Sequence, residues 1–372
     1  MLNSFLLVAS MHLLRVPLPL YVERVGGGPS QVGLVMATLA LSSTLARPYL
    51  GRLVDRLGGK PSLLLGSLIF TIGPLLYTIS RSVPALLVVQ FLHGLGISAA
   101  STSYIILVAA LAPVGRRGEA IGLSATTVPL ALIAAPVIGT SFLESQGYVP
   151  TFILSASVAA LSLFTAFFVA EPRSRDRHED SDKECESSFF QVLCLRSVWV
   201  PSMAMGMLAM AYGSILTFLP LFAFQQNIDN PGLFFTAYGL TLIAAQVLAG
   251  RVSDRVGRFQ VIVPAMVLLA LAFLVLASVR SLLLLLGVAV LYALGFGSAQ
   301  VNLDALMVDT VPISIRGMAM SIAYGSGDLG IGLGAYLLGW VAQIWGYQVM
   351  YGSVGIVCLL GGAVFALLVK KV

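Results

Sequence analysis

Ionisable side chains stand inside long apolar stretches of this 372-residue chain. His12 and Arg15 lie one helical turn apart near the start, His93 lies within another apolar stretch, and Asp328 lies in one close to the end. Charged groups are costly in hydrocarbon, so such residues are candidates for a functional site. Asp328 is the strongest candidate, because a lone carboxylate in an apolar setting tends to take up a proton and can couple proton exchange to substrate binding.

Each candidate also has a structural interpretation. Asp328 has the alternative role of hydrogen-bonding a neighbouring helix, and His12 and His93 have the alternative role of packing or hydrogen-bonding residues. Arg15 lies toward one end of its stretch, where it either extends to the membrane interface or binds an anionic group of a substrate.

The elements that position these residues are predicted to be membrane-spanning helices. Hydrophobic residues make up 58% of the chain and charged residues only 10%, against about 25% charged in a soluble domain. The apolar runs are long enough to cross a bilayer as helices and lack the alternation of a barrel strand. We therefore predict an all-α membrane protein with twelve spans: 2–22, 31–51, 61–80, 84–108, 118–142, 148–170, 198–222, 232–252, 258–278, 281–307, 317–342 and 347–369.

The polar stretch 171–197 separates two sets of six spans, 1–170 and 198–372. It has few apolar residues and is expected to be a solvated linker. Seventeen of the 21 Lys and Arg residues fall in loops on the linker's side of the membrane. Since positive loops are retained in the cytoplasm, we expect both termini and the linker to be cytoplasmic in a cell (inner) membrane protein. Asp304 and Asp309, near the cytoplasmic end of their span, are expected to be interfacial.

The chain start leaves two interpretations open. Met1 stands directly at the first span with no flanking basic residue, so whether it is the natural start is open. A secretory signal peptide is disfavoured, because the stretch has no basic leading region and is needed to make the number of spans even.

The two halves share an internal repeat. Gly51-Arg-Leu-Val-Asp-Arg-Leu-Gly58 recurs as Gly250-Arg-Val-Ser-Asp-Arg-Val-Gly257, an offset of 199 residues. The same offset aligns Gly147-Tyr148 with Gly346-Tyr347. One register therefore holds over residues 51–148, which indicates a duplication of six spans in parallel orientation.

The segment GRLVDRLGGK resembles the signature of the major facilitator superfamily between helices 2 and 3, and 250–257 resembles its weaker second copy. LARPYLGRLVDRLGGKPSLLLG, QFLHGLGISAASTSYIILVAALAPVGRRGEAIG and YGSGDLGIGLGAYLLG are similar to a twelve-helix bacterial efflux branch of the drug:proton antiporter type. The resemblance implies two parallel six-helix pseudo-symmetric bundles, a central cavity lined by helices 1, 4, 7 and 10, and alternating access.

The resemblance also implies a cytoplasmic latch at the repeated segment. There a carboxylate can pair with an arginine and face the positive end of a neighbouring helix, and glycine permits close helix approach. The alternative is that these arginines only set topology, which leaves the aspartates unexplained. The predicted gate comprises Gly51, Asp55, Arg56, Gly58, Gly250, Asp254, Arg255 and Gly257.

Two further positions bear on direction and coupling. Pro136 and Gly139 resemble the helix-5 motif of antiporters, although Ala135 stands where the family pattern has glycine; a local bend and export are expected. In helix 4 the family commonly has an arginine, associated with proton transfer, where Gln90 stands. The proton path then depends on Asp328, His93 or Arg15, or the carrier is coupled differently.

We expect a secondary transporter that exports a small organic solute by proton antiport, working as a monomer in the lipid bilayer. No GxxxxGK[ST] phosphate-binding motif is present, so the proton gradient is the expected energy source, without a cofactor. Import by symport or uniport is the alternative, and a polytopic membrane enzyme is the alternative from another class. The cysteines lack metal-ligand spacing, and neither a metal site nor a nucleic-acid partner is expected.

The substrate is not specified by the sequence. Met and aromatic residues either form an adaptable apolar pocket or are ordinary helix packing. The residues concerned are Phe5, Met205, Met207, Tyr212, Phe218 and Tyr292.

Overall fold

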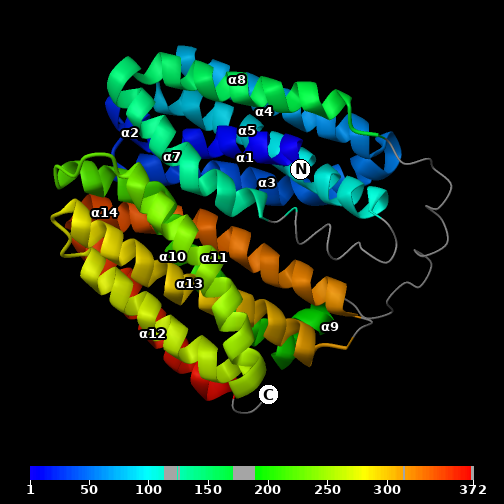
Figure 1. The fold of residues 1–372 in the computed structure, drawn as a ribbon, viewed down its shortest axis with the longest axis vertical. Helices are drawn as coiled ribbons and strands as arrows, with labels where there is room; N and C mark the ends of the chain where they lie inside the picture. The colour runs from blue at the N-terminus through cyan, green and yellow to red at the C-terminus, as the bar shows by residue number, and fades with distance from the viewer. Residues whose placement is uncertain (113–123, 125, 171–188, 313–314, 370–372) are drawn as a thin grey trace. The chain divides into compact units, whose positions relative to one another are not determined.

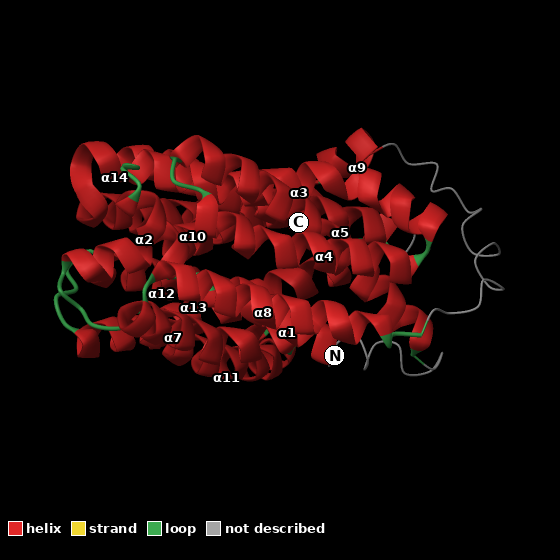
Figure 2. Cartoon of the chain, turned by 90° about the horizontal axis from the view of Figure 1, so that it is seen from above, coloured by secondary structure: helices red, strands yellow, loops and turns green. Residues whose placement is uncertain are grey.

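The computed structural model describes residues 1–112, 124, 126–170, 189–312 and 315–369. Within these ranges the regular elements are helices and there is no strand (Figure 2). The chain divides into two units, Met1–His178 with Asn230–Thr236, and Glu179–Asp229 with Ala237–Val372.

Apart from the segment between α5 and α7, the helices of the first unit follow one another through short connections (Figure 1). They are α1 (Leu2–Leu13), α2 (Pro17–Arg24), α3 (Pro29–Leu57), α4 (Gly59–Ile79), α5 (Val83–Leu111), α7 (Thr127–Gln146) and α8 (Tyr148–Phe167).

The second unit begins with a short helix and continues with long ones. They are α9 (Phe189–Cys194), α10 (Arg196–Gln225), α11 (Gly232–Val256), α12 (Arg258–Leu276), α13 (Leu282–Thr310) and α14 (Arg316–Val369). The first residues of α11, up to Thr236, group with the first unit.

The predicted number of spans is confirmed. Eleven helical segments of the described chain are long and apolar enough to cross a membrane. The last of these, α14, consists of two helices that meet at Gly346, whose φ of 82° and ψ of 167° interrupt the helix. Large apolar side chains such as Ile79, 72% exposed, and Leu283, 83% exposed, face outward, as expected for surfaces covered by lipid.

Three segments differ from the predicted spans. The first span is two helices, because Pro17 and the turn before it interrupt the helical ladder. The predicted linker 171–197 contains helix α9 and the start of α10, since an apolar FFQVLC segment lies inside that polar stretch. The predicted span 118–142 starts in residues outside the described part, and α7 begins at Thr127.

The 199-residue repeat extends to backbone conformation. Gly58 and Gly257 have φ/ψ of 98°/163° and 99°/150° between two helices. Gly147 and Gly346 have 86°/−176° and 82°/167°. A positive φ is costly for residues with a side chain, so the same two turns require glycine in each half.

Close helix crossings are repeated as well. A β-carbon at Gly96 of α5 would lie 3.2 Å from the Gly66 carbonyl oxygen of α4. At the matching place in the second unit, a β-carbon at Gly295 would lie 2.9 Å from the Ala265 carbonyl oxygen. Helices in lipid gain little from the hydrophobic effect and associate through such close packing.

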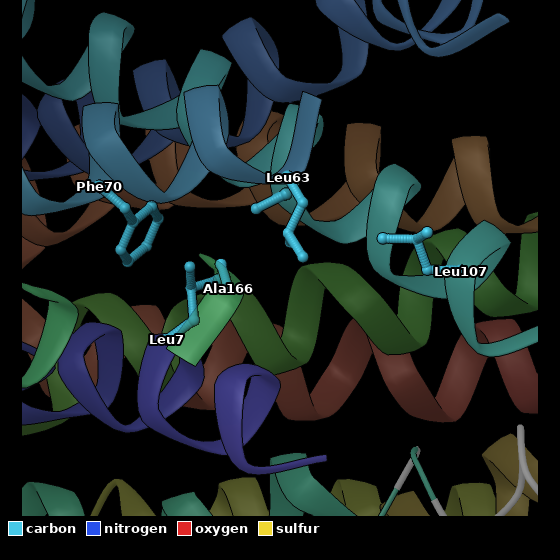
Figure 3. Packing of buried hydrophobic residues seen from close by; sticks show 6 residues of the cluster. Leu7, Leu63, Phe70, Leu107 and Ala166 are labelled. Carbon is cyan, nitrogen blue, oxygen red and sulfur yellow. The ribbon is translucent and has the colours of Figure 1, made fainter. Parts of the chain in front are cut away.

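The interior of the first unit joins four helices. Leu7 of α1, Leu63 and Phe70 of α4, Leu107 of α5 and Ala166 of α8 belong to one buried cluster (Figure 3). This cluster fixes the first span against the helices that follow it.

Polar bonds add to the contact between α1 and α8. The Ser10 hydroxyl donates to the Ser155 carbonyl oxygen at 2.8 Å, and the Ser155 hydroxyl donates to the Ser10 carbonyl oxygen at 2.9 Å. One end of the helix has a second pair, in which the Asn3 amide donates to the Ser162 carbonyl at 2.7 Å. Because these groups are buried and paired, α1 is held to α8 along its length.

Candidate functional site

The break in the first span lies at His12 and Arg15. α1 ends at Leu13, and the backbone N–H of Arg15 donates to the His12 carbonyl at 3.1 Å. Pro17 begins α2 and has no N–H for the Leu13 carbonyl, so the regular ladder stops here. Both polar side chains are buried, with 2% of His12 and 9% of Arg15 exposed. The break in the first span therefore has two buried polar side chains.

The two side chains contact each other. Arg15 Nε donates to His12 Nδ1 at 3.3 Å. His12 Nε2 is buried and has no hydrogen-bond partner among the described residues. The predicted pair is thus one unit, positioned by the end of α1 and the turn before α2.

The helix-5 motif packs against the same break. α7 contains Pro136 within its helix, and a β-carbon at Gly139 would collide with the Leu13 carbonyl oxygen. The Thr140 hydroxyl donates to the Pro136 carbonyl oxygen at 2.8 Å. The residue that contacts Gly139 was not predicted from the sequence. It is Leu13, in the interrupted backbone of the first span.

Gln90 and His93 form a second buried cluster, between α4 and α5. The Tyr77 hydroxyl donates to Gln90 Oε1 at 2.8 Å and lies 3.0 Å from His93 Nδ1. Phe70 packs on the His93 ring with centroids 4.1 Å apart. Since the single Tyr77 proton is directed to Gln90, His93 Nδ1–H donates to the Tyr77 oxygen. This leaves His93 Nε2 as a buried acceptor with no partner in the described chain.

Asp328 is half-buried on a glycine-rich part of α14 that packs closely on α10. A β-carbon at Gly330 would collide with the Gly206 carbonyl oxygen, and one at Gly213 would lie 2.9 Å from the Ile331 carbonyl oxygen. The Ser326 hydroxyl donates across this contact to the Ser202 carbonyl at 2.7 Å. The predicted carboxylate therefore stands beside a tight helix contact.

Asp304 of α13 is half-buried. Its carboxylate lies near Tyr324 of α14, and Oδ1 is buried with no hydrogen-bond partner within the described ranges. Tyr324 precedes Asp328 by four residues, so both lie on one face of α14. Tyr324 was not predicted from the sequence. Its spacing from Asp328 was visible there, but Asp304 lies on a separate helix, α13.

The second copy of the repeated segment forms an ion cluster around Arg258. Arg258 Nη1 lies 2.6 Å from Asp254 Oδ1, and Arg258 Nε lies 3.2 Å from Asp309 Oδ2. The Asp254 carboxylate thus pairs with Arg258, which was not among the predicted gate residues. Arg255, which was predicted, is exposed. A β-carbon at Gly250 would meet nothing within 4 Å, so the expected close helix approach at this residue is wrong.

The first copy is described only in part. Gly51, Asp55 and Arg56 belong to α3, but their side chains lie outside the described part of the chain. Gly58 has the positive φ of its counterpart Gly257.

Aromatic side chains gather inside the second unit. Tyr212 of α10 lies 5.1 Å from Phe296 of α13, and Tyr238 of α11 lies 5.2 Å from Tyr292 of α13, by ring centroids. Tyr292 and Phe296 stack at 5.6 Å. These two pairs therefore join α10, α11 and α13, and Tyr212 is only partly buried.

Helical spans in two repeated units, with buried polar groups on several of them, define a polytopic membrane carrier. The family model of the Major Facilitator Superfamily matches residues 1–234 and 224–372. The chain belongs to the major facilitator superfamily, whose members transport solutes and are not enzymes.

Relatives and solved structures agree with this membership. An uncharacterized MFS-type transporter of Methanocaldococcus jannaschii is 22% identical, over 100% of this chain and 97% of its own. The multi-drug resistance efflux pump PmrA of Streptococcus pneumoniae is 26% identical, over 83% and 80%. The xylose transporter XylE of E. coli shares the fold, with a TM-score of 0.77, 16% identity and coverage of 98% and 93%. The predicted fold class is confirmed.

Proposed function

We propose that the protein exports a small organic solute across the cell membrane in exchange for protons. The observation that carries this proposal is the similarity to PmrA, a multi-drug resistance efflux pump, over most of both chains. The packing of Gly139 on the first span supports it, because the antiporter-like motif then touches a span with buried polar groups.

Proton coupling requires a group that binds and releases a proton as the carrier changes state. Asp328 and Asp304 are the candidate carboxyl groups, and both lie on membrane-spanning helices. Asp304 lies near Tyr324 in space, and Asp328 follows Tyr324 by four residues on α14. A ligand shifts a two-state equilibrium only through different affinities for the two states. Protonation of such a carboxyl supplies that difference, because it removes a charge from an apolar setting.

The test is transport in inside-out membrane vesicles that contain the protein. A panel of fluorescent solutes, with ethidium as one probe, is added outside the vesicles while a proton gradient with an acidic interior is imposed. We expect accumulation of at least one compound that collapses when the gradient is dissipated. Uptake that requires the opposite gradient would indicate import, and uptake independent of any gradient would indicate uniport; either result contradicts antiport.

Asp328→Asn tests the coupling role directly. Asparagine keeps the size and hydrogen-bonding capacity of the side chain but cannot carry a proton, so gradient-driven accumulation is expected to fall to background while protein remains in the membrane. Asp229→Asn, at an exposed loop carboxylate of the same unit, is the matched control and is expected to transport normally. Normal accumulation by Asp328→Asn would remove this residue from the proton path.

A further inference from the structure

We infer that residues 230–236 act as a strap that closes on α7 at Pro136 and is released from it in each transport cycle. These residues follow α10 and include the start of α11, yet they belong to the first unit. The inference goes beyond the proposed function, because it holds for either direction of transport and for any source of energy.

Two hydrogen bonds join the strap to α7. Near the end of that helix, the Asn230 amide donates to the Ser141 hydroxyl oxygen at 3.0 Å. Eight residues earlier, the Thr236 hydroxyl donates to the Ile133 carbonyl oxygen at 2.5 Å. Residues eight apart lie on the same face of an α-helix, so both ends of the strap are fixed to one side of α7.

Between these two bonds, the backbone of the strap lies directly against α7. A β-carbon at Gly232 would lie 2.7 Å from the Pro136 carbonyl oxygen and 2.8 Å from the Val137 α-carbon. Pro136 lies inside α7 and has no N–H for the carbonyl four residues before it, so the helix lacks one backbone hydrogen bond here. Because Gly232 has no side chain, the strap fits closely onto the proline of the helix-5 motif.

The chain on both sides of the strap belongs to the second unit. α11 begins within the strap at Gly232 and continues to Val256, so one helix carries residues of both units. A helix moves as a stiff element, because a sharp bend disrupts its backbone hydrogen bonds. Carriers built from two repeats work by rocking one repeat against the other. Displacement of the body of α11 relative to α7 therefore strains the bonds of the strap, and their release is a step of the cycle.

The two hydrogen bonds are possible in one copy of the internal repeat only. The 199-residue offset aligns Thr236 with Ala37 and Ser141 with Trp340. Alanine has no hydroxyl to donate, and the tryptophan indole has no acceptor for an amide. The strap is thus an addition to the duplicated backbone arrangement, made by the polar side chains of one copy.

Distances between spin labels in the purified full chain test whether the strap opens. The labels are attached through Glu144→Cys on α7 and Asp229→Cys beside the strap, both exposed positions, in a chain whose three native cysteines are replaced by serine. We expect two populations, a short distance for the closed strap and a longer one for the released strap. One and the same distance in every variant would overturn the inference.

Thr236→Val and Gly232→Ala should each shift these populations toward the longer distance. Valine keeps the shape of threonine but removes one hydrogen bond, so the ratio of released to closed protein should rise by about threefold to tenfold. The alanine β-carbon would collide with the Pro136 carbonyl oxygen, so the effect of Gly232→Ala should be at least as large. Gly287→Ala, where a β-carbon meets nothing within 4 Å, is the matched control and should leave the ratio unchanged. An unchanged ratio in both strap variants would contradict the strap.

Reversible cross-linking tests whether transport requires the release. Asn230→Cys and Ser141→Cys place two thiols across the contact, and a short bis-methanethiosulfonate reagent joins them through disulfides that dithiothreitol cleaves. Transport of compounds from the vesicle panel should stop on cross-linking and return after reduction. Asn3→Cys with Ser162→Cys joins α1 to α8 in the same way and is the control that should leave transport unchanged. Continued transport with the strap cross-linked would show that release is not needed.

The strap and the proposed function fail separately. If gradient-driven transport persists in the cross-linked protein, the strap fails and the antiporter proposal stands. If cross-linking blocks a transport that is independent of the proton gradient, antiport fails and the strap stands. The spin-label distances do not depend on the solute, so they test the strap even where no compound of the panel is moved.

Discussion

Asp304 and Tyr324 show how a residue's neighbours on another helix change its interpretation. From the sequence, Asp304 was placed at the interface because it lies near the end of a span. The structure places it near Tyr324 and leaves one carboxylate oxygen buried without a hydrogen-bond partner in the described chain. Such a group inside a span is a candidate to carry a proton, with Tyr324 as its partner.

We expect Asp304→Asn to abolish gradient-driven efflux but to retain exchange of labelled for unlabelled solute, because exchange needs binding and movement without net proton transfer. Vesicle transport in both modes measures this. Asp229→Asn, at an exposed loop carboxylate of the same unit, is the control for gradient-driven efflux. Efflux by Asp304→Asn at the wild-type level would show that this carboxyl is not in the proton path.

The ion cluster around Arg258 is expected to contribute little to stability. Asp254 is 63% exposed at its side chain and Asp309 is 54% exposed. Exposed pairs are worth about 0.2–1 kcal/mol, so Arg258→Gln should shift the melting temperature only slightly. A large loss of transport in that variant, with the melting temperature nearly unchanged, is expected if the cluster acts as a latch; unchanged transport would contradict the latch.

At the scale of elements, α7 and the first span are fitted to each other. The turn at 14–16 follows from Pro17, and the Leu13 carbonyl next to it lies where a β-carbon at Gly139 would be. The turn that Pro17 causes in the first span is thus accommodated by Gly139 of α7, which has no side chain.

Gly139→Ala is expected to destabilise the protein by about 1–3 kcal/mol, the usual cost of forcing extra volume into a packed contact. Thermal unfolding in detergent measures it. Gly287→Ala is the matched control, because a β-carbon there meets nothing within 4 Å. Alanine in an open helical position is neutral or stabilising by about 0.5–1 kcal/mol, so equal melting temperatures for the two variants would contradict the packing argument.

The sequence predicted the elements better than their contacts. Hydropathy and the 199-residue repeat were sufficient for the spans, because apolar length and glycine turns are local signals. The partner of Gly139, the contact between Asp304 and Tyr324, and the Tyr77 bond to Gln90 each join separate helices. No spacing along the chain specifies which helices meet, so these parts of the site required the structure.

At the scale of the whole molecule, the two units share a repeated backbone arrangement but have different side chains in their interiors. The 199-residue offset aligns His12 and Gln90 with alanines and aligns His93 with Tyr292. At these three positions the first unit has buried polar side chains, whereas the second has two buried alanines and Tyr292, which stacks on Phe296. The duplication therefore preserved the helix crossings while the interiors took different chemistry.

The orientation of the chain is a prediction at this scale. The distribution of Lys and Arg predicts that both termini are cytoplasmic. Alkaline phosphatase is active only where its disulfides form, so a fusion after Gly257 should be inactive and a fusion after Arg280 active. A green fluorescent protein at the C-terminus should fluoresce. The reverse pattern of enzyme activity would invert the topology.

The break in the first span also affects how the protein is made. This span contains Arg15, and an arginine costs about 2.5–3.5 kcal/mol at the centre of an inserting helix. The serines that bond α1 lie in α8 and are synthesised much later. Residues 1–26 alone should therefore insert poorly in a glycosylation-based insertion assay, and Arg15→Leu should restore insertion. The first span would then reach its final place in the bilayer only after α8 has been translated, so biogenesis depends on helices that follow far behind it.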